Sequence, residues 1–142
     1  MDLIFRTLAP SEAKAASELE SECLHTAWSE EQIKSLPSYA LYLGAFSGDT
    51  LCGVVSAYII ADEVQVMNLA VSPKYRRMGI ALGLMEEIIK AGKEKGCCNI
   101  SLEVAENNPN AISLYEKCGF SAVGRRKGFY GDIAAVIMEK IL

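Results

Sequence analysis

The stretch 64–89 constrains the fold of this chain more than any other, because it combines a strand, a turn, a glycine loop and a helix. Its first part, 64–71, is rich in valine and leucine, and Pro73 ends the strand because proline has no amide hydrogen to donate. After the loop, apolar residues recur at helical spacing, as at Leu84 and Ile88. The stretch therefore predicts a strand that leads through a loop into a helix with one buried face.

The loop between that strand and that helix has the spacing Arg-x-x-Gly-x-Ala, with small residues at Gly79 and Ala81. The first amides of a helix have no partner within it and carry partial positive charge, which favours a phosphate there. The spacing matches neither the dinucleotide fingerprint nor a P-loop. We therefore predict a phosphate-bearing ligand at 77–82; the alternative is an ordinary helix start with a packing glycine.

Length, charge and cysteine content exclude several classes of protein. The 142 residues predict a single domain, 1–142, and a net charge of −4 argues against binding nucleic acid. No apolar run is long enough to span a membrane, and the N-terminus lacks the features of a signal peptide. Five cysteines without a Cys-x-x-Cys pair, beside one histidine, predict neither a metal site nor a disulfide framework. We expect a cytoplasmic monomer or weak dimer that contacts no membrane.

The rest of the chain predicts an α/β protein. Strands are expected at 3–8, 39–46, 51–60, 64–71, 98–105, 120–126 and 133–138, with 128–132 connecting the last two. Ser11 is expected to cap the first helix, whose charged residues form a solvated face, and Ser29 with Gln32 forms a capping box. Asn108 and Pro109 begin the last helix. Hairpins combined with two helical crossovers predict one mixed, mostly antiparallel seven-stranded sheet with four helices.

The segment between the first two helices contains the only tryptophan and the only histidine. Trp28 precedes the capping box, so its side chain is expected either to staple onto Ile33 or to line a groove for the acceptor. His25 has the pKa of a base that works near neutral pH, but no nucleophile is paired with it in the sequence. Both alternatives stay open for Trp28.

These features together resemble the GNAT N-acetyltransferases, and among them the RimI type, which acetylates the N-terminal alanine of a ribosomal protein. The resemblance extends over nearly the whole chain. It rests on 27–30, on 68–73, on the loop 76–81, on 102–104, and on 108–120, which is similar to the family run Asn-x-x-Ala-x-x-Leu-Tyr-x-x-x-Gly-Phe. The segment 127–132 is shorter than is usual for RimI-like enzymes, and it lies where the acceptor is expected.

The resemblance implies acetyl-CoA as the cosubstrate, without a metal. Main-chain groups of Leu69, Ala70 and Val71 are then expected to hold the pantetheine arm and the thioester carbonyl. The diphosphate is expected at the amides of the loop, namely Arg77, Met78, Gly79, Ile80, Ala81 and Leu82. Asn108 is expected to bond the cofactor arm.

The resemblance also implies two catalytic residues, with direct attack of the acceptor in a ternary complex. Glu103 is the expected general base, provided that burial raises its pKa, and Tyr115 is the expected general acid for the leaving thiolate. The alternatives are a surface glutamate on an alternating strand and a core aromatic residue. A cysteine nucleophile has no supporting pattern in the sequence.

The expected acceptor is the N-terminal α-amine of a protein, and in particular the N-terminal alanine of a small-subunit ribosomal protein. An α-ammonium has a pKa near 8 and a lysine ammonium one of about 10.4, so the α-amine is neutralised at lower cost. Two other functions remain open: acetylation of a small amine or a protein lysine, and a non-catalytic module that binds acyl-CoA.

Overall fold

The computed structural model describes residues 2–142, except for the side chains of Phe129 and Tyr130. Its strands are β1 (Leu3–Thr7), β2 (Ala40–Ser47), β3 (Thr50–Ile60), β4 (Glu63–Val71), β5 (Asn99–Ala105), β6 (Ser121–Tyr130) and β7 (Ile133–Ile141). Its helices are α1 (Ala13–Cys23), α2 (Glu30–Lys34), α3 (Ile80–Glu94) and α4 (Pro109–Lys117), with 3-10 turns at Pro10–Glu12 and Pro73–Tyr75. The predicted α/β architecture of seven strands and four helices is confirmed for this described part.

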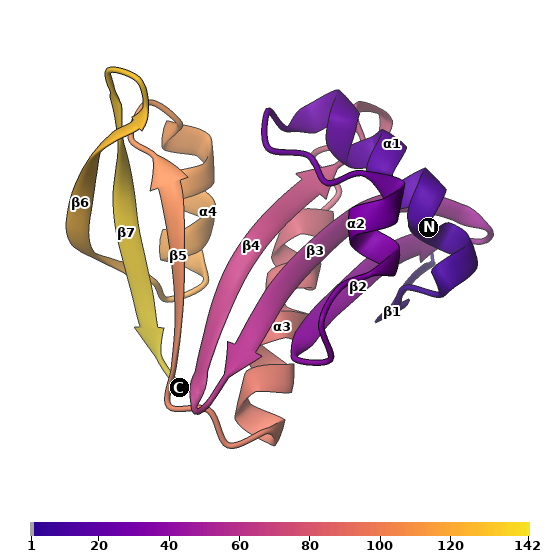
Figure 1. Cartoon of the computed structure of the whole chain (residues 1–142), viewed down its shortest axis with the longest axis horizontal. Coiled ribbons are helices and arrows are strands. Elements are labelled where there is room, and N and C mark those ends of the chain that lie inside the picture. The colour runs from indigo at the N-terminus through magenta and orange to yellow at the C-terminus, as the bar shows by residue number, and fades with distance from the viewer. Residues whose placement is uncertain (1) are drawn as a thin grey trace.

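The strands form one sheet in the order β1-β2-β3-β4-β5-β7-β6 (Figure 1). Strands β4 and β5 are parallel, and the other neighbouring pairs are antiparallel. The parallel pairing covers three residue pairs, from Glu63 opposite Asn99 to Gln65 opposite Ser101. Beyond Gln65 the two strands diverge, so the sheet opens into a V toward the C-terminal ends of β4 and β5 (Figure 1).

Helices cover both faces of this split sheet (Figure 1). Helix α3 buries Leu84, Met85 and Ile88 in the larger core, which also contains residues from β3, β4 and β5. Helices α1 and α2 cover the other face over β2, β3 and β4, where Ala16 and Ile33 lie in a second core. Both cores meet β3 and β4, so these strands fix α1 and α3 relative to each other.

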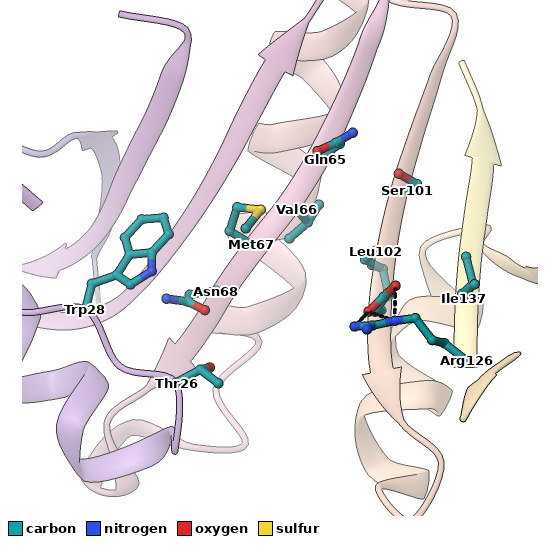
Figure 2. A pocket seen from close by; sticks show the side chains of 11 residues that line it. Thr26, Trp28, Gln65, Val66, Met67, Asn68, Ser101, Leu102, Arg126 and Ile137 are labelled. Atoms are coloured by element: carbon teal, nitrogen blue, oxygen red, sulfur yellow. Dashed lines mark hydrogen bonds and ion pairs between the residues drawn. The ribbon is translucent and has the colours of Figure 1, made fainter. Parts of the chain in front are cut away.

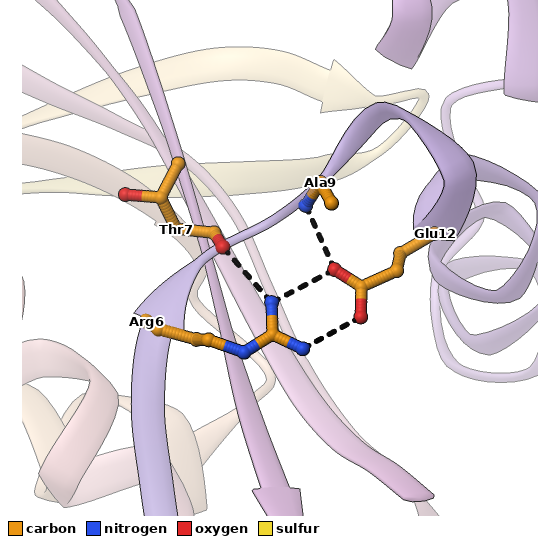
Figure 3. A network of polar contacts seen from close by, with 4 residues as sticks. All are labelled: Arg6, Thr7, Ala9 and Glu12. Atoms are coloured by element: carbon orange, nitrogen blue, oxygen red, sulfur yellow. Dashed lines mark hydrogen bonds and ion pairs between the residues drawn. The ribbon is translucent and has the colours of Figure 1, made fainter. Parts of the chain in front are cut away.

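The turn from β1 into α1 is held by Glu12 and not by the predicted cap Ser11, so that prediction is wrong (Figure 3). The Glu12 carboxylate accepts a hydrogen bond from the Ala9 amide at 2.7 Å and two from Arg6, from Nη1 at 2.9 Å and Nη2 at 2.7 Å. Arg6 lowers the pKa of Glu12, chiefly through this hydrogen bonding. The 3-10 turn brings Glu12 back over the preceding amide, a geometry that the shorter serine side chain does not supply.

Two of the other local predictions are confirmed and one needs correction. Ser29 and Gln32 form the capping box, and Asn108 caps α4 by accepting the Ala111 amide at 3.2 Å. The predicted connection 128–132 is mostly strand, because β6 continues to Tyr130, which pairs with Ile133 across a two-residue turn.

Among residues 2–142, none of the helices has the length and apolar character that crossing a bilayer requires.

Gly53 lets α3 approach β3 closely, so we predict that Gly53→Ala destabilises the fold. A Cβ at this position would lie 2.9 Å from Ile80 Cγ2 and 3.2 Å from the Ala70 carbonyl oxygen. Overpacking of this kind costs about 1–3 kcal/mol. Urea unfolding should therefore show a loss of this size relative to Gly124→Ala, whose Cβ would come no closer than 3.4 Å to its neighbours. Equal stability of the two variants would contradict the prediction.

Candidate active site

The opening between β4 and β5 contains a cavity of about 510 Å³ that extends from the end of α1 to α4. Its lining includes Leu69 and Asn108, two of the residues that the sequence predicted for cofactor binding. Beyond Gln65 no strand pairs with this edge of β4 in the described part of the chain, so its backbone polar groups face the opening. The Val71 carbonyl already accepts bonds from Cys23 Sγ and Arg76 Nε, both at 3.4 Å.

A β-bulge at Met67 shapes this edge of β4. Ser56 lies opposite Asn68 and Ala57 opposite Val66, so Met67 is the extra residue. A bulge re-aims the side chains that follow it and is common beside active sites. Here Asn68 turns into the buried layer beneath α1, while Met67 stays 45% exposed.

The start of α3 forms a second cavity, of about 300 Å³, next to the first; Leu114 lines both. Gly79 precedes the helix with a φ of 76°, in the left-handed region that favours glycine. Gly83 is the first residue of α3 whose amide forms a bond of the helical pattern, to the Gly79 carbonyl oxygen at 2.9 Å. The preceding amides thus supply the partial positive charge of a helix N-terminus, and Arg77 and Lys117 add basic side chains.

Of the residues predicted for the diphosphate loop, Arg77, Gly79, Ile80, Ala81 and Leu82 line this second cavity. Met78 and Ala70 are not in the lining of either cavity. Ala70 is buried against α1, and the Met78 side chain is half exposed.

Glu103 lies on β5 and lines two cavities, the one described first and a third of about 480 Å³ that Trp28 also lines. Arg126 on β6 pairs with its carboxylate, with Nη2 at 2.6 Å from Oε2 and Nε at 3.1 Å from Oε1. The Glu103 side chain is 34% exposed, so the burial that the sequence analysis required of it is absent. Arg126, which that analysis did not name, instead fixes the direction of the carboxylate.

Tyr115 on α4 lines the same cavity as Glu103, so the structure brings the two predicted catalytic side chains together. Burial raises the pKa of Tyr115 to about 12, with a smaller contribution from Cys118. The Tyr115 hydroxyl makes no hydrogen bond to the described part of the chain. Every fully buried side-chain oxygen in that part has a hydrogen-bond partner, so the Tyr115 hydroxyl is not fully buried and reaches the cavity. The phenol is thus a protonated donor at neutral pH.

Trp28 lines the third cavity (Figure 2) and also packs against the core that contains Ile33, so both predictions for its side chain stand. Its ring stacks on that of Tyr58, with centroids 6.1 Å apart, and lies 6.3 Å from that of Tyr42. His25 is exposed but lines the cavity that contains Glu103 and Tyr115. The five cysteines are free thiols, and no cluster of three potential metal ligands occurs among the described residues.

Glu20 is a second residue that was not predicted from the sequence, because the charged residues of α1 were expected on a solvated face. Its side chain is 0% exposed. Oε1 accepts the Trp28 amide and the Asn68 side-chain amide, both at 2.9 Å, and Oε2 accepts the Tyr42 hydroxyl. The pKa of Tyr42 is raised by burial and by this carboxylate, so the phenol remains a donor.

A sequence signal for this burial existed. Ala13, Ala16 and Glu20 follow one another at spacings of three and four residues, so Glu20 falls on the apolar stripe of α1. A carboxylate in an apolar stripe needs several hydrogen-bond donors. Those donors come from a loop, β2 and β4, which the sequence of α1 does not reveal.

Comparisons with known proteins find relatives over most of the chain. The model of a family described as the acetyltransferase (GNAT) family matches residues 6–120. The [ribosomal protein bS18]-alanine N-acetyltransferase of Escherichia coli K12 is 28% identical over 137 residues, 93% of this chain and 93% of that protein. The protein of the same name from Haemophilus influenzae is 32% identical over 114 residues, 80% of this chain and 77% of that one.

A solved structure extends this likeness to three dimensions. The crystal structure of the ribosomal-protein-S18-alanine N-acetyltransferase from Escherichia coli superposes on this chain with a TM-score of 0.91. The superposition covers 99% of this chain and 94% of the other, at 27% sequence identity. The split sheet and the helices around it are therefore the arrangement that both chains share.

We predict that Glu20→Ala lowers the free energy of unfolding by about 3 kcal/mol, because three donors then lose a buried acceptor. Urea unfolding followed by the fluorescence of Trp28, the single tryptophan, measures this loss. Glu18→Ala is the matched control, since Glu18 lies exposed on the same helix and should change stability by less than about 0.5 kcal/mol. A similar small effect of both variants would contradict the prediction.

Proposed function

The match over residues 6–120 means that this chain belongs to the acetyltransferase (GNAT) family, as a RimI-like N-acetyltransferase, and we propose that it transfers acetyl from acetyl-CoA to the N-terminal α-amine of a protein. One observation carries the proposal: Glu103 and Tyr115 line a single cavity beside the unpaired edge of β4. Two relatives have the name [ribosomal protein bS18]-alanine N-acetyltransferase. We propose the N-terminal alanine of such a small-subunit protein as the acceptor.

The proposed acetyl-CoA site extends from the loop before α3 to the opening in the sheet. The amides at the start of α3, with Arg77 beside them, suit a diphosphate, because the helix end supplies unpaired donors and positive charge. Main-chain groups of β4 around Leu69 suit the pantetheine arm. Asn108 uses Oδ1 to cap α4, which leaves its amide hydrogens for the same arm.

We propose Glu103 as the general base, acting directly or through one water molecule. The thioester of acetyl-CoA supplies the acyl carbon, and its carbon–sulfur bond breaks as the amine nitrogen–carbon bond forms. Neutralising an α-ammonium at neutral pH costs only about 1 kcal/mol, so a carboxylate of ordinary basicity is sufficient. The Arg126 pair leaves acceptor sites free, because a carboxylate has about four lone-pair positions.

We propose Tyr115 as the donor to the leaving sulfur. A free thiol has a pKa of about 8.5, and the pKa of Tyr115 is about 12, so complete proton transfer to the thiolate is uphill. A hydrogen bond that strengthens as charge develops on sulfur still lowers the barrier. The raised pKa of Tyr115 favours this electrostatic role over early proton release.

We predict that Glu103→Gln lowers kcat by about 100-fold or more and Tyr115→Phe by about tenfold or more, because each variant removes one proton-handling group. Thiol release from acetyl-CoA with an alanine-initiated peptide measures both. Glu106→Gln is the matched control, since the exposed carboxylate of Glu106 pairs with Arg125 in the same manner but lines neither cavity.

His25→Ala completes this experiment, because His25 is the other candidate base in the cavity. A large loss of kcat in His25→Ala, together with wild-type turnover of Glu103→Gln, would overturn the assignment of the base. Wild-type turnover in both Glu103→Gln and Tyr115→Phe would overturn the proposed chemistry.

We predict that a peptide beginning Ala-Arg is acetylated faster than the same peptide with a blocked N-terminus and one free lysine. Neutralising the lysine ammonium at neutral pH costs about 4 to 5 kcal/mol, compared with about 1 kcal/mol for the α-ammonium. This difference alone favours the α-amine as the acceptor. Rates are compared by mass spectrometry at equal peptide concentrations. Equal rates, or faster lysine acetylation, would contradict the α-amine proposal in favour of the alternative acceptor, a protein lysine.

A further inference from the structure

Asn68 is a buried amide beside the proposed reaction centre that the mechanism above does not use. It follows the bulge in β4, and its residue surface is only 7% exposed. Its side chain lines both cavities that contain Glu103. A polar side chain that is buried this deeply requires partners for its hydrogen-bonding atoms.

One half of the Asn68 amide is fixed by Glu20. The Nδ2 group donates to Glu20 Oε1 at 2.9 Å, and the same oxygen accepts the Trp28 amide hydrogen at 2.9 Å. Because Oε1 accepts from a backbone amide, it is an acceptor and must face the NH2 group of Asn68. This fixes the orientation of the amide and turns Oδ1 away from Glu20. Figure 2 shows the nitrogen on the side of Trp28 and the oxygen on the side of β5.

The other half of the amide is unpaired. Among the described residues, nothing donates a hydrogen bond to Asn68 Oδ1. No fully buried side-chain oxygen in this part of the chain lacks a partner, so Oδ1 must be accessible from the cavity. It is therefore a fixed acceptor facing the same space as the Glu103 carboxylate.

We propose that Asn68 Oδ1 accepts an N–H bond from the attacking amine of the acceptor and that Glu20 is a positioning residue which holds Asn68 in this orientation. The inference rests on the proposed function. A neutral primary amine has two N–H groups and one lone pair. With one N–H on Asn68 and the other directed to Glu103, the lone pair remains for the acyl carbon. Holding the nitrogen in this way supplies the orientation that a direct attack requires.

The neutral amide suits this role better than a second carboxylate. An amide oxygen accepts the hydrogen bond without adding a negative charge, and a negative charge would stabilise the unreactive ammonium form. The Glu20 charge is shared among three donors and faces away from the cavity oxygen. The arrangement therefore orients the amine without opposing its deprotonation.

The test uses the whole chain, with the better acceptor of the two peptides described above. Asn68→Ala should lower kcat/KM for the acceptor by about tenfold or more, through the loss of a hydrogen bond in a buried site. The KM for acetyl-CoA should stay at the wild-type value. Asn68→Leu, which keeps the branched shape of the side chain and lacks the oxygen, should give the same result if the alanine variant does not fold.

Variants of Glu20 and Tyr42 separate orientation from general stability. Glu20→Ala, assayed well below its melting temperature, should lose acceptor kcat/KM as Asn68→Ala does, whereas Glu20→Gln should restore most of it because its Oε1 still accepts from Asn68. Tyr42→Phe is the matched control, since it removes a donor to the other oxygen, Oε2, and should leave acceptor kcat/KM unchanged.

The outcomes of this test are distinct from those of the proposed function. If the wild-type protein acetylates an α-amine while Asn68→Ala and Asn68→Leu keep acceptor kcat/KM, this inference is overturned and the proposed function stands. If Glu20→Gln is as impaired as Glu20→Ala, or if Tyr42→Phe is equally impaired, the positioning role of Glu20 is overturned. If no amine is acetylated by the wild-type protein, the proposed function fails first.

Discussion

The divergence of β4 from β5 is the constraint on which the rest of this structure depends. The two strands pair over three residue pairs and then separate. Backbone groups along the freed edge of β4 lose their strand partners, and such groups need others. The cavities, Glu103 and the start of α3 all lie along this opening. A continuous sheet would have had no room for a ligand at this place.

The two faces of the opening differ in chemistry because different helices cover them. On one face, α3 presents its N-terminus beside Arg77, and close packing over Gly53 holds that helix against β3. On the other face, α1 is joined to β2 and β4 through the buried carboxylate of Glu20. Both helices are thereby fixed to the same strands. A cosubstrate on one face and an acceptor on the other would then meet with little freedom of movement.

The two residues proposed for proton transfer occupy different environments. Glu103 is one-third exposed and is held by Arg126, whereas Tyr115 is buried, which raises its pKa to about 12. Arg126 fixes the direction of the Glu103 carboxylate, and the buried Tyr115 phenol remains a hydrogen-bond donor. Such a division between paired groups is how one site supplies both a base and an acid at the same pH.

The sequence alone determined the features that depend on neighbours a few positions away. The element order, the capping box at Ser29, the Asn108 cap and the glycine loop before α3 were all predicted, and the family resemblance pointed to Glu103 and Tyr115. Only the tertiary structure decided which polar side chains are buried and how they pair. Glu20 finds its donors 8, 22 and 48 positions along the chain, and Arg126 reaches Glu103 across 23 positions. Local periodicity contains no information about such distant partners, because they meet only when the strands take their register.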